Sequence, residues 1–196
     1  MISDNPGIQN IEGRMQYYRY RCLFLALIIA LMTGCSSISS PSEDPPALRL
    51  LPPLSAPEQV LKQKVLLQAQ EIEREFLLIS RLTPENIIAV VLLPTGQTLL
   101  QLKYDGQNFS QQVFLPGDVP GHELLAIMQF SVWPEQIIRD RYNAVSGWHT
   151  AFSEDMRSLS WKNQLLLQVE REAGQLTVMN NLHGYRVVIK DLESDR

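Results

Sequence analysis

The sequence predicts an α+β protein, mainly β, in which helices lie against the concave face of one antiparallel sheet. Three observations predict this fold. Apolar and polar residues alternate with a period of two in two regions of the chain, and a segment with helical spacing separates these regions. Short turn signals join the alternating segments, which leaves no room for the crossover helices of a parallel sheet.

The composition excludes some classes of protein. The chain has 196 residues, of which 45% are hydrophobic and 19% charged, as expected for one globular domain with an additional segment. Its formal net charge is −4, and no basic stripe is visible that would attract a phosphate backbone. The sequence therefore argues against nucleic acid as a partner.

An uncharged apolar run, residues 22–34, follows the basic residues Arg14, Arg19 and Arg21 near the start of the chain. This arrangement is typical of a secretory signal peptide, which we assign to residues 1–34. The run is shorter than the roughly 20 residues of a membrane-spanning helix, so no permanent span is expected. Translation can start at Met1 or at Met15.

The run ends in Met32-Thr33-Gly34-Cys35, which resembles the lipobox of bacterial lipoproteins. The resemblance implies cleavage before Cys35, acylation of Cys35 and insertion of its acyl chains into a membrane. Ser36 implies the outer membrane, at its periplasmic face. The alternative is that Cys35 is a reduced thiol. Residues 35–58 are rich in Ser and Pro and are predicted to form a lipidated tether, with the folded domain at 59–196.

Five predicted strands begin the domain. The segment 86–93 is apolar on both faces, and Asp105-Gly106 is the strongest hairpin signal in the chain. The predicted strands are 61–69, 71–79, 86–93, 97–104 and 107–115.

Apolar residues then recur at helical spacing from Leu124 to Val132. Asp118 is the predicted N-cap, Pro134 ends the helix, and a second short helix is expected at 135–140. After a looser stretch, 143–158, further strands are predicted at 164–170, 175–182 and 185–190. In the first of these, Leu165, Leu167 and Val169 are expected to share one face.

The predicted inner face of the sheet is apolar, and two residues of the first helix are expected to point towards it. The residues of this face and the two helix residues are expected to line a pocket for a lipid-like chain. The alternative is a closed core. The predicted lining consists of Phe76, Leu100, Leu102, Val113, Leu124, Met128, Leu167, Val178 and Val187.

Three segments carry a family resemblance: the run 90–102, the turn Tyr104-Asp105-Gly106, and the run 124–134 ending in Trp133-Pro134. They resemble the lipoproteins of domain of unknown function 3261, which are similar in layout to LolB, the outer-membrane receptor for lipoproteins. Some members are encoded with aryl polyene biosynthesis enzymes. The resemblance implies a LolA/LolB-like half-barrel closed by helices around a cavity that holds acyl chains.

One turn departs from the LolB pattern. LolB has a protruding leucine in an Asn-Pro-Leu-Gly turn, whereas the matching turn here is Leu93-Pro94-Thr95-Gly96. Thr95 occupies the leucine position at this loop tip, and Leu93 could substitute for it only in part. The resemblance therefore implies the cavity and the location but not the receptor activity.

No catalytic or metal-binding motif is apparent. His122, His149 and His183 are scattered without metal-ligand spacing, and neither a nucleophile elbow nor a phosphate-binding loop is present. We therefore expect no cofactor, no metal site and no enzymatic activity. The predicted function is binding or transfer of a lipid or acyl-chain-containing product, including an aryl polyene lipid. The alternatives are a noncatalytic scaffold of an envelope synthesis or export complex and a periplasmic hydrolase.

Overall fold

The computed structural model describes residues 44–53, 58–114 and 119–192. The chain from Pro45 onward forms one compact unit. The predicted signal peptide, Cys35 and Asp118 lie outside the described residues.

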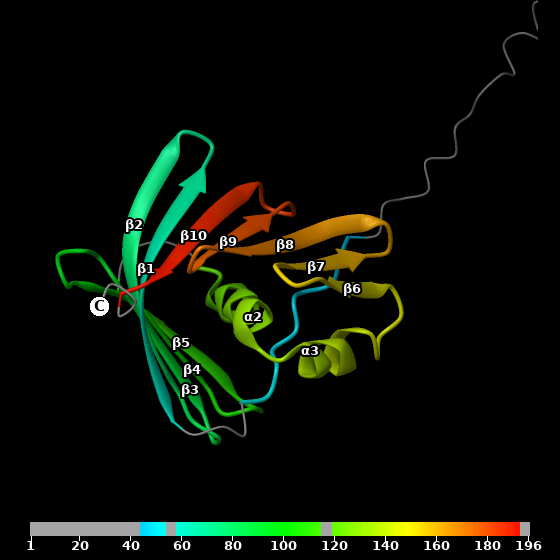
Figure 1. Cartoon of the computed structure of the whole chain (residues 1–196). Coiled ribbons are helices and arrows are strands. Elements are labelled where there is room, and N and C mark those ends of the chain that lie inside the picture. Colours follow the sequence, from blue (N-terminus) through cyan, green and yellow to red (C-terminus); the bar gives the residue numbers. More distant parts are fainter. Residues whose placement is uncertain (1–43, 54–57, 115–118, 193–196) are drawn as a thin grey trace, which may run out of the picture. The chain divides into compact units, whose positions relative to one another are not determined.

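The compact unit contains an open antiparallel sheet of ten strands, consistent with a half-barrel. Figure 1 shows the sheet bending round helix α2. The strands are β1 (Gln59–Ala69), β2 (Ile72–Leu82), β3 (Ile87–Leu92), β4 (Thr98–Tyr104), β5 (Phe109–Val113), β6 (Trp148–Phe152), β7 (Met156–Trp161), β8 (Gln164–Glu172), β9 (Gln175–Asn180) and β10 (Tyr185–Asp191). The predicted antiparallel, mainly β fold is confirmed.

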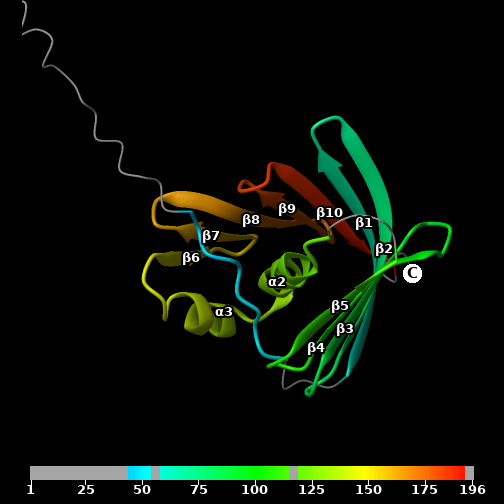
Figure 2. The same cartoon turned by 180° about the vertical axis from the view of Figure 1, so that it is seen from behind.

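The strand order is β5-β4-β3-β2-β1-β10-β9-β8-β7-β6. Each half of the sheet is a meander of five strands that are consecutive in the sequence. The two meanders join where the first strand pairs with the last, from Gln63 opposite Asp191 to Ala69 opposite Tyr185. Because β5 and β6 are the two edges, the helices between them in sequence cross the concave side (Figure 2).

Two helices separate the meanders, α2 (Gly121–Val132) and α3 (Glu135–Tyr142). Pro134 ends α2 as predicted, because the residue before it is extended, with ψ 153° at Trp133. Helix α2 packs closest to β4 and β5. A Cβ at Gly121 would lie 2.6 Å from Leu102 Cδ2, so the absence of a side chain allows this close approach.

The stretch 143–158, predicted to be irregular, contains strand β6 and the start of β7. Its alternation was missed because a polar residue, Thr150, occupies a buried position between Trp148 and Phe152. Thr150 is satisfied there by a hydrogen bond of 3.2 Å from its hydroxyl to Asn143 Oδ1.

A β-bulge corrects the predicted inner face of β8. The register shifts so that Leu159 pairs with Leu167 and Ser160 with Leu165, which leaves Leu166 without an opposite residue. Leu166 is buried, whereas Leu165 is 38% exposed. The prediction that Leu165 shares a face with Leu167 was therefore wrong.

The start of the folded domain was placed too late at residue 59. Residues 45–53, here called the N-terminal strap, belong to the compact unit and bury Leu48, Leu50 and Leu51. The strap is cyan in Figures 1 and 2, where it runs past both helices. Its prolines suggested an extended tether, and it is indeed without helix or strand, but its leucines complete the core.

Candidate functional site

The concave face of the sheet is covered unevenly. Next to α2, the inner residues of β4 are buried, namely Leu100, Leu102 and Tyr104. Further round the sheet, on β1, β2, β9 and β10, several inner apolar residues are only half-buried. We call five of them the half-covered strip: Val65, Leu67, Phe76, Leu176 and Val187.

Three residues of the strip belong to one row of directly paired residues that crosses five strands and includes Ile189, which is buried in the core. Leu176 of β9 pairs with Ile189 of β10, which pairs with Val65 of β1, which in turn pairs with Phe76 of β2. On the other side, Leu176 pairs with Arg171 of β8. Since paired residues share a face of the sheet, an apolar row on the concave face ends at an arginine.

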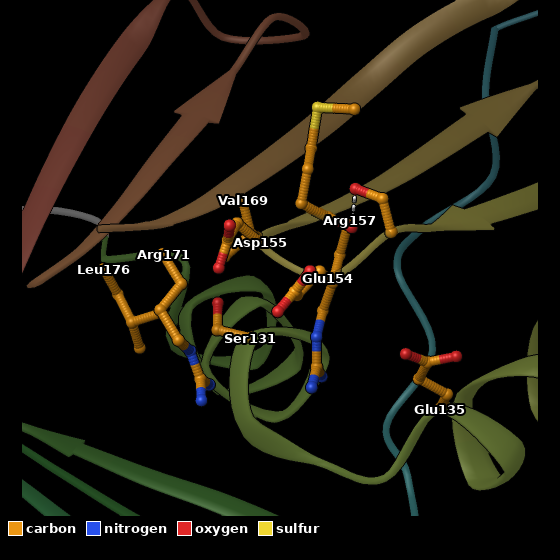
Figure 3. Close-up of a pocket in the computed structure, with 10 residues that line it drawn as sticks. Ser131, Glu135, Glu154, Asp155, Arg157, Val169, Arg171 and Leu176 are labelled. Atoms are coloured by element: carbon orange, nitrogen blue, oxygen red, sulfur yellow. Dashed lines mark hydrogen bonds between the residues drawn. The ribbon is translucent and has the colours of Figure 1, made fainter. Parts of the chain in front are cut away.

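A small polar cavity lies at the arginine end of this row (Figure 3). Its volume is about 60 Å³, far below the roughly 300 Å³ at which ligand pockets begin, so it can hold only a small group. It is lined by residues of α2 and of strands β7 to β9, by Glu135 at the start of α3, and by the turn that precedes β7: Ser131, Glu135, Ser153, Glu154, Asp155, Met156, Arg157, Val169, Arg171 and Leu176.

Arg157 is held in this cavity by the end of helix α2. Its Nη1 donates to the carbonyl oxygens of Phe130 at 3.2 Å and Trp133 at 2.6 Å. A cation is favoured there because the C-terminal carbonyls of a helix carry partial negative charge. The pKa of Arg157 is nevertheless lowered, mainly by burial and then by the charge of Arg171.

Neither Arg157 nor Arg171 forms an ion pair with a carboxylate among the described residues. Glu135 instead pairs with Arg139, with 3.6 Å between Oε2 and Nη2. Glu154 and Asp155 are exposed in the turn between β6 and β7. The cavity therefore contains two guanidinium groups whose charge is not neutralised by direct contact with a described acidic side chain.

The structure divides the predicted pocket residues into two groups. Five of them are buried in the core, where they pack against other residues of the chain: Leu100, Leu102, Met128, Leu167 and Val178. The other four are half-buried: Phe76, Val113, Leu124 and Val187. Phe76 and Val187 belong to the half-covered strip, and none of the predicted residues lines the polar cavity.

The predicted loop tip is the turn between β3 and β4. The Gly96 N–H donates to the carbonyl of Leu93 at 2.8 Å, and the Leu93 N–H donates to that of Gln97 at 2.8 Å. Thr95 is exposed at the turn, whereas Leu93 is half-buried. The side chain at the tip is thus the polar one.

A second polar cluster surrounds Glu123 in the first turn of α2. Its Oε1 accepts hydrogen bonds from Asn180 Nδ2 at 2.8 Å and from the Tyr185 hydroxyl at 3.2 Å, and its Oε2 lies 3.1 Å from His183 Nε2. Burial and the neighbouring carboxylate raise the pKa of Tyr185. Because each partner comes from β9, β10 or the turn between them, the cluster joins α2 to that hairpin.

The other two histidines of the chain, His122 and His149, lie outside this cluster. His122 packs edge-on against Phe109, with ring centroids 5.4 Å apart, and His149 is exposed on β6. In the part of the chain that the structure describes, no three potential ligands gather to hold a metal ion. Within the same residues, no helix has both the length and the apolar character needed to cross a membrane.

Sequence reasoning missed Arg157 and Arg171. Arg171 had a usable signal, because it continues the period-two series Leu167, Val169, Arg171 on the inner face. Arg157 had none, because it lies in the stretch that was predicted to be irregular and its place at the end of α2 comes from distant packing.

Fold and site together define a class: a mainly β protein whose open antiparallel sheet curves round a helix and leaves part of its apolar concave face half-covered. The chain belongs to the family described as "Protein of unknown function (DUF3261)", whose model matches residues 51–193. The comparison with curated proteins found no match.

Proposed function

We propose that this protein binds or transfers a lipid or another acyl-chain-containing molecule at the periplasmic face of the outer membrane. In this proposal acyl chains on Cys35 anchor it to that membrane. The observation that supports binding is the half-covered strip, since apolar side chains on a concave surface favour contact with an apolar chain.

The sequence resemblance, which implies a LolA/LolB-like layout, also supports the proposal, because a half-barrel of that kind encloses acyl chains. An aryl polyene lipid is one ligand of the proposed class. Receptor activity like that of LolB is not part of the proposal, since the exposed residue at the β3–β4 turn is Thr95 and not leucine.

A comparison of two variants tests the role of the strip. Phe76 points to the concave side of β2, and Ile79, which is 40% exposed, points to the convex side. Phe76→Asp places a charge where the apolar chain is expected and should abolish saturable binding of a fluorescent fatty acid to the full chain. Ile79→Asp introduces the same charge on the opposite face and should leave binding unchanged.

Native mass spectrometry of the full chain, extracted from its own membranes, provides the complementary measurement. We expect a co-purifying acyl-containing species with the parent protein and with Ile79→Asp. Absence of any such species, together with no saturable binding by the parent, would contradict the proposal and favour a scaffold function.

A further inference from the structure

We infer that the ligand carries an anionic headgroup, a carboxylate or a phosphate, which Arg171 binds beside Arg157 in the polar cavity. Its apolar chain then lies along the row from Leu176 to Phe76. This inference rests on the proposed function and adds the chemical class of the ligand and its direction in the site.

The row has the polarity that an amphiphile requires. A guanidinium stands at one end, Leu176 borders the cavity, and Ile189, Val65 and Phe76 follow on successive strands. Phe76 is half-buried and does not pack against the buried core, so the far end of the row offers apolar surface to a ligand.

The length of the row also fits an acyl chain. Four inter-strand steps separate β8 from β2, and at about 4.8 Å per step they span roughly 19 Å along the sheet. The hydrocarbon core of a bilayer is roughly 30 Å thick, and an acyl chain in one leaflet spans about half of that thickness. A chain of ordinary length therefore reaches from the cavity towards Phe76.

At the cavity, an anion has two guanidinium groups as partners, those of Arg157 and Arg171, and three carboxylates line the same cavity: Glu135, Glu154 and Asp155. Figure 3 shows the side chains of Arg157 and Arg171 extending on either side of Ser131. Arg157 is half-buried and fixed by the carbonyls of Phe130 and Trp133, whereas Arg171 is exposed at the cavity's edge. A bound anion would offset the mutual repulsion of the two guanidinium groups, which contributes to the lowered pKa of Arg157.

Among the described residues, no carboxylate of the cavity lining forms an ion pair with Arg157 or Arg171. Glu135 is paired with Arg139, and the exposed side chains of Glu154 and Asp155 make no ion pair with either cavity arginine. A headgroup that also carries an amine is compatible with these carboxylates, but the guanidinium groups require only the anion.

Two probes that differ only in their headgroup test the inference. cis-Parinaric acid and its methyl ester share one fluorescent chain, and only the acid carries a negative charge. With the full chain as purified, we expect the acid to bind roughly tenfold more tightly than the ester, because a charge-assisted hydrogen bond to arginine is lost in the ester.

Matched variants identify the residue responsible. Arg171→Gln should remove the preference for the acid, and Arg171→Lys should retain most of the preference. Arg186→Gln is the control, since Arg186 is exposed on the convex face of β10, between the inner residues Tyr185 and Val187. It removes the same charge and should preserve the preference.

The outcomes separate this inference from the proposed function. Equal binding of acid and ester by the parent, or an unchanged preference in Arg171→Gln, overturns the headgroup assignment and leaves the lipid-binding proposal standing. Failure of both probes to bind contradicts the proposed function itself. Displacement of the acid by millimolar inorganic phosphate would identify a site for a free anion and would overturn the assignment to an amphiphile.

Discussion

The side-chain amide of Gln129 forms two hydrogen bonds with the backbone of Leu51. The Leu51 N–H donates to Oε1 at 2.9 Å, and Nε2 donates to the Leu51 carbonyl at 2.6 Å. Trp133 Nε1 donates to the carbonyl of Pro52 at 2.9 Å, and the Arg49 N–H donates to the Tyr142 hydroxyl at 3.1 Å. Side chains of the α2–α3 segment thus hold the N-terminal strap through its backbone.

Replacement of Gln129 by leucine should destabilise the protein. Gln129 and Leu51 are both fully buried, so the variant leaves the N–H and carbonyl of Leu51 without partners. We expect a loss of about 2–4 kcal/mol in the free energy of unfolding, measured with urea. Cleavage by trypsin after Arg49 should also become faster, because the strap detaches more readily.

The control for this prediction is Gln136→Leu. Gln136 is exposed on α3, where its Nε2 donates to Asp140 Oδ1 at 2.8 Å. Its replacement should change the free energy of unfolding by less than about 0.5 kcal/mol. Equal stability of the two variants would show that the buried amide does not hold the strap.

Replacement by alanine should destabilise the protein more at Gly147 than at Gly174. Both have positive φ, 97° and 76°, but a Cβ at Gly147 would lie 2.7 Å from the Trp161 ring, whereas Gly174 has open space. We expect Gly174→Ala to cost about 1–2 kcal/mol for the left-handed backbone. Gly147→Ala should cost roughly 1–3 kcal/mol more for the steric overlap. Thermal unfolding of both variants measures the difference, and similar losses would contradict a steric role of Trp161.

The stability of the protein should fall at alkaline pH because of Tyr142. Burial raises the pKa of Tyr142 to about 12, from about 10 in the unfolded chain. The stabilisation is complete below pH 10 and is lost as the pH rises towards 12, because only the unfolded chain ionises readily in that range. The loss should reach roughly 2–3 kcal/mol.

Tyr142→Phe separates this effect from general alkaline unfolding. The variant loses the hydrogen bonds to Arg49, at about 1 kcal/mol each, and should be less stable at pH 7. Between pH 10 and 12 its free energy of unfolding should fall less steeply than that of the parent. Parallel curves would contradict the assignment to Tyr142, since the pKa values of Tyr104 and Tyr185 are also raised and both remain in the variant.

Replacement of Cys35 by alanine should abolish lipoprotein maturation. The resemblance of residues 32–35 to a lipobox predicts that globomycin-sensitive processing and membrane association both depend on this thiol. Cys22→Ala is the matched control, because Cys22 lies inside the predicted signal peptide and should be dispensable. Unchanged processing and membrane fractionation of Cys35→Ala would show that the lipoprotein prediction is wrong.

Much of the fold followed from local patterns in the sequence. Alternation predicted eight of the ten strands, and the turn at Asp105-Gly106 joins β4 to β5 as expected. There the Asp105 carboxylate accepts hydrogen bonds from the Asn108 side-chain amide and from the backbone N–H groups of Asn108 and Gln107, which together lower its pKa to about 2. Such features depend on neighbours within a few residues, so they can be recognised without the rest of the chain.

By itself, then, the sequence determined eight of the ten strands, both described helices and most of their apolar faces. Only the tertiary structure decided how much of the concave face α2 covers, that the strap joins the core, and that Arg157 meets Arg171 at a cavity. Leu51 and Gln129 are 78 positions apart, and the strands that meet in the middle of the sheet are its first and last. Local periodicity shows on which face of its strand or helix a residue lies. Which segment packs against that face depends on contacts between distant parts of the chain.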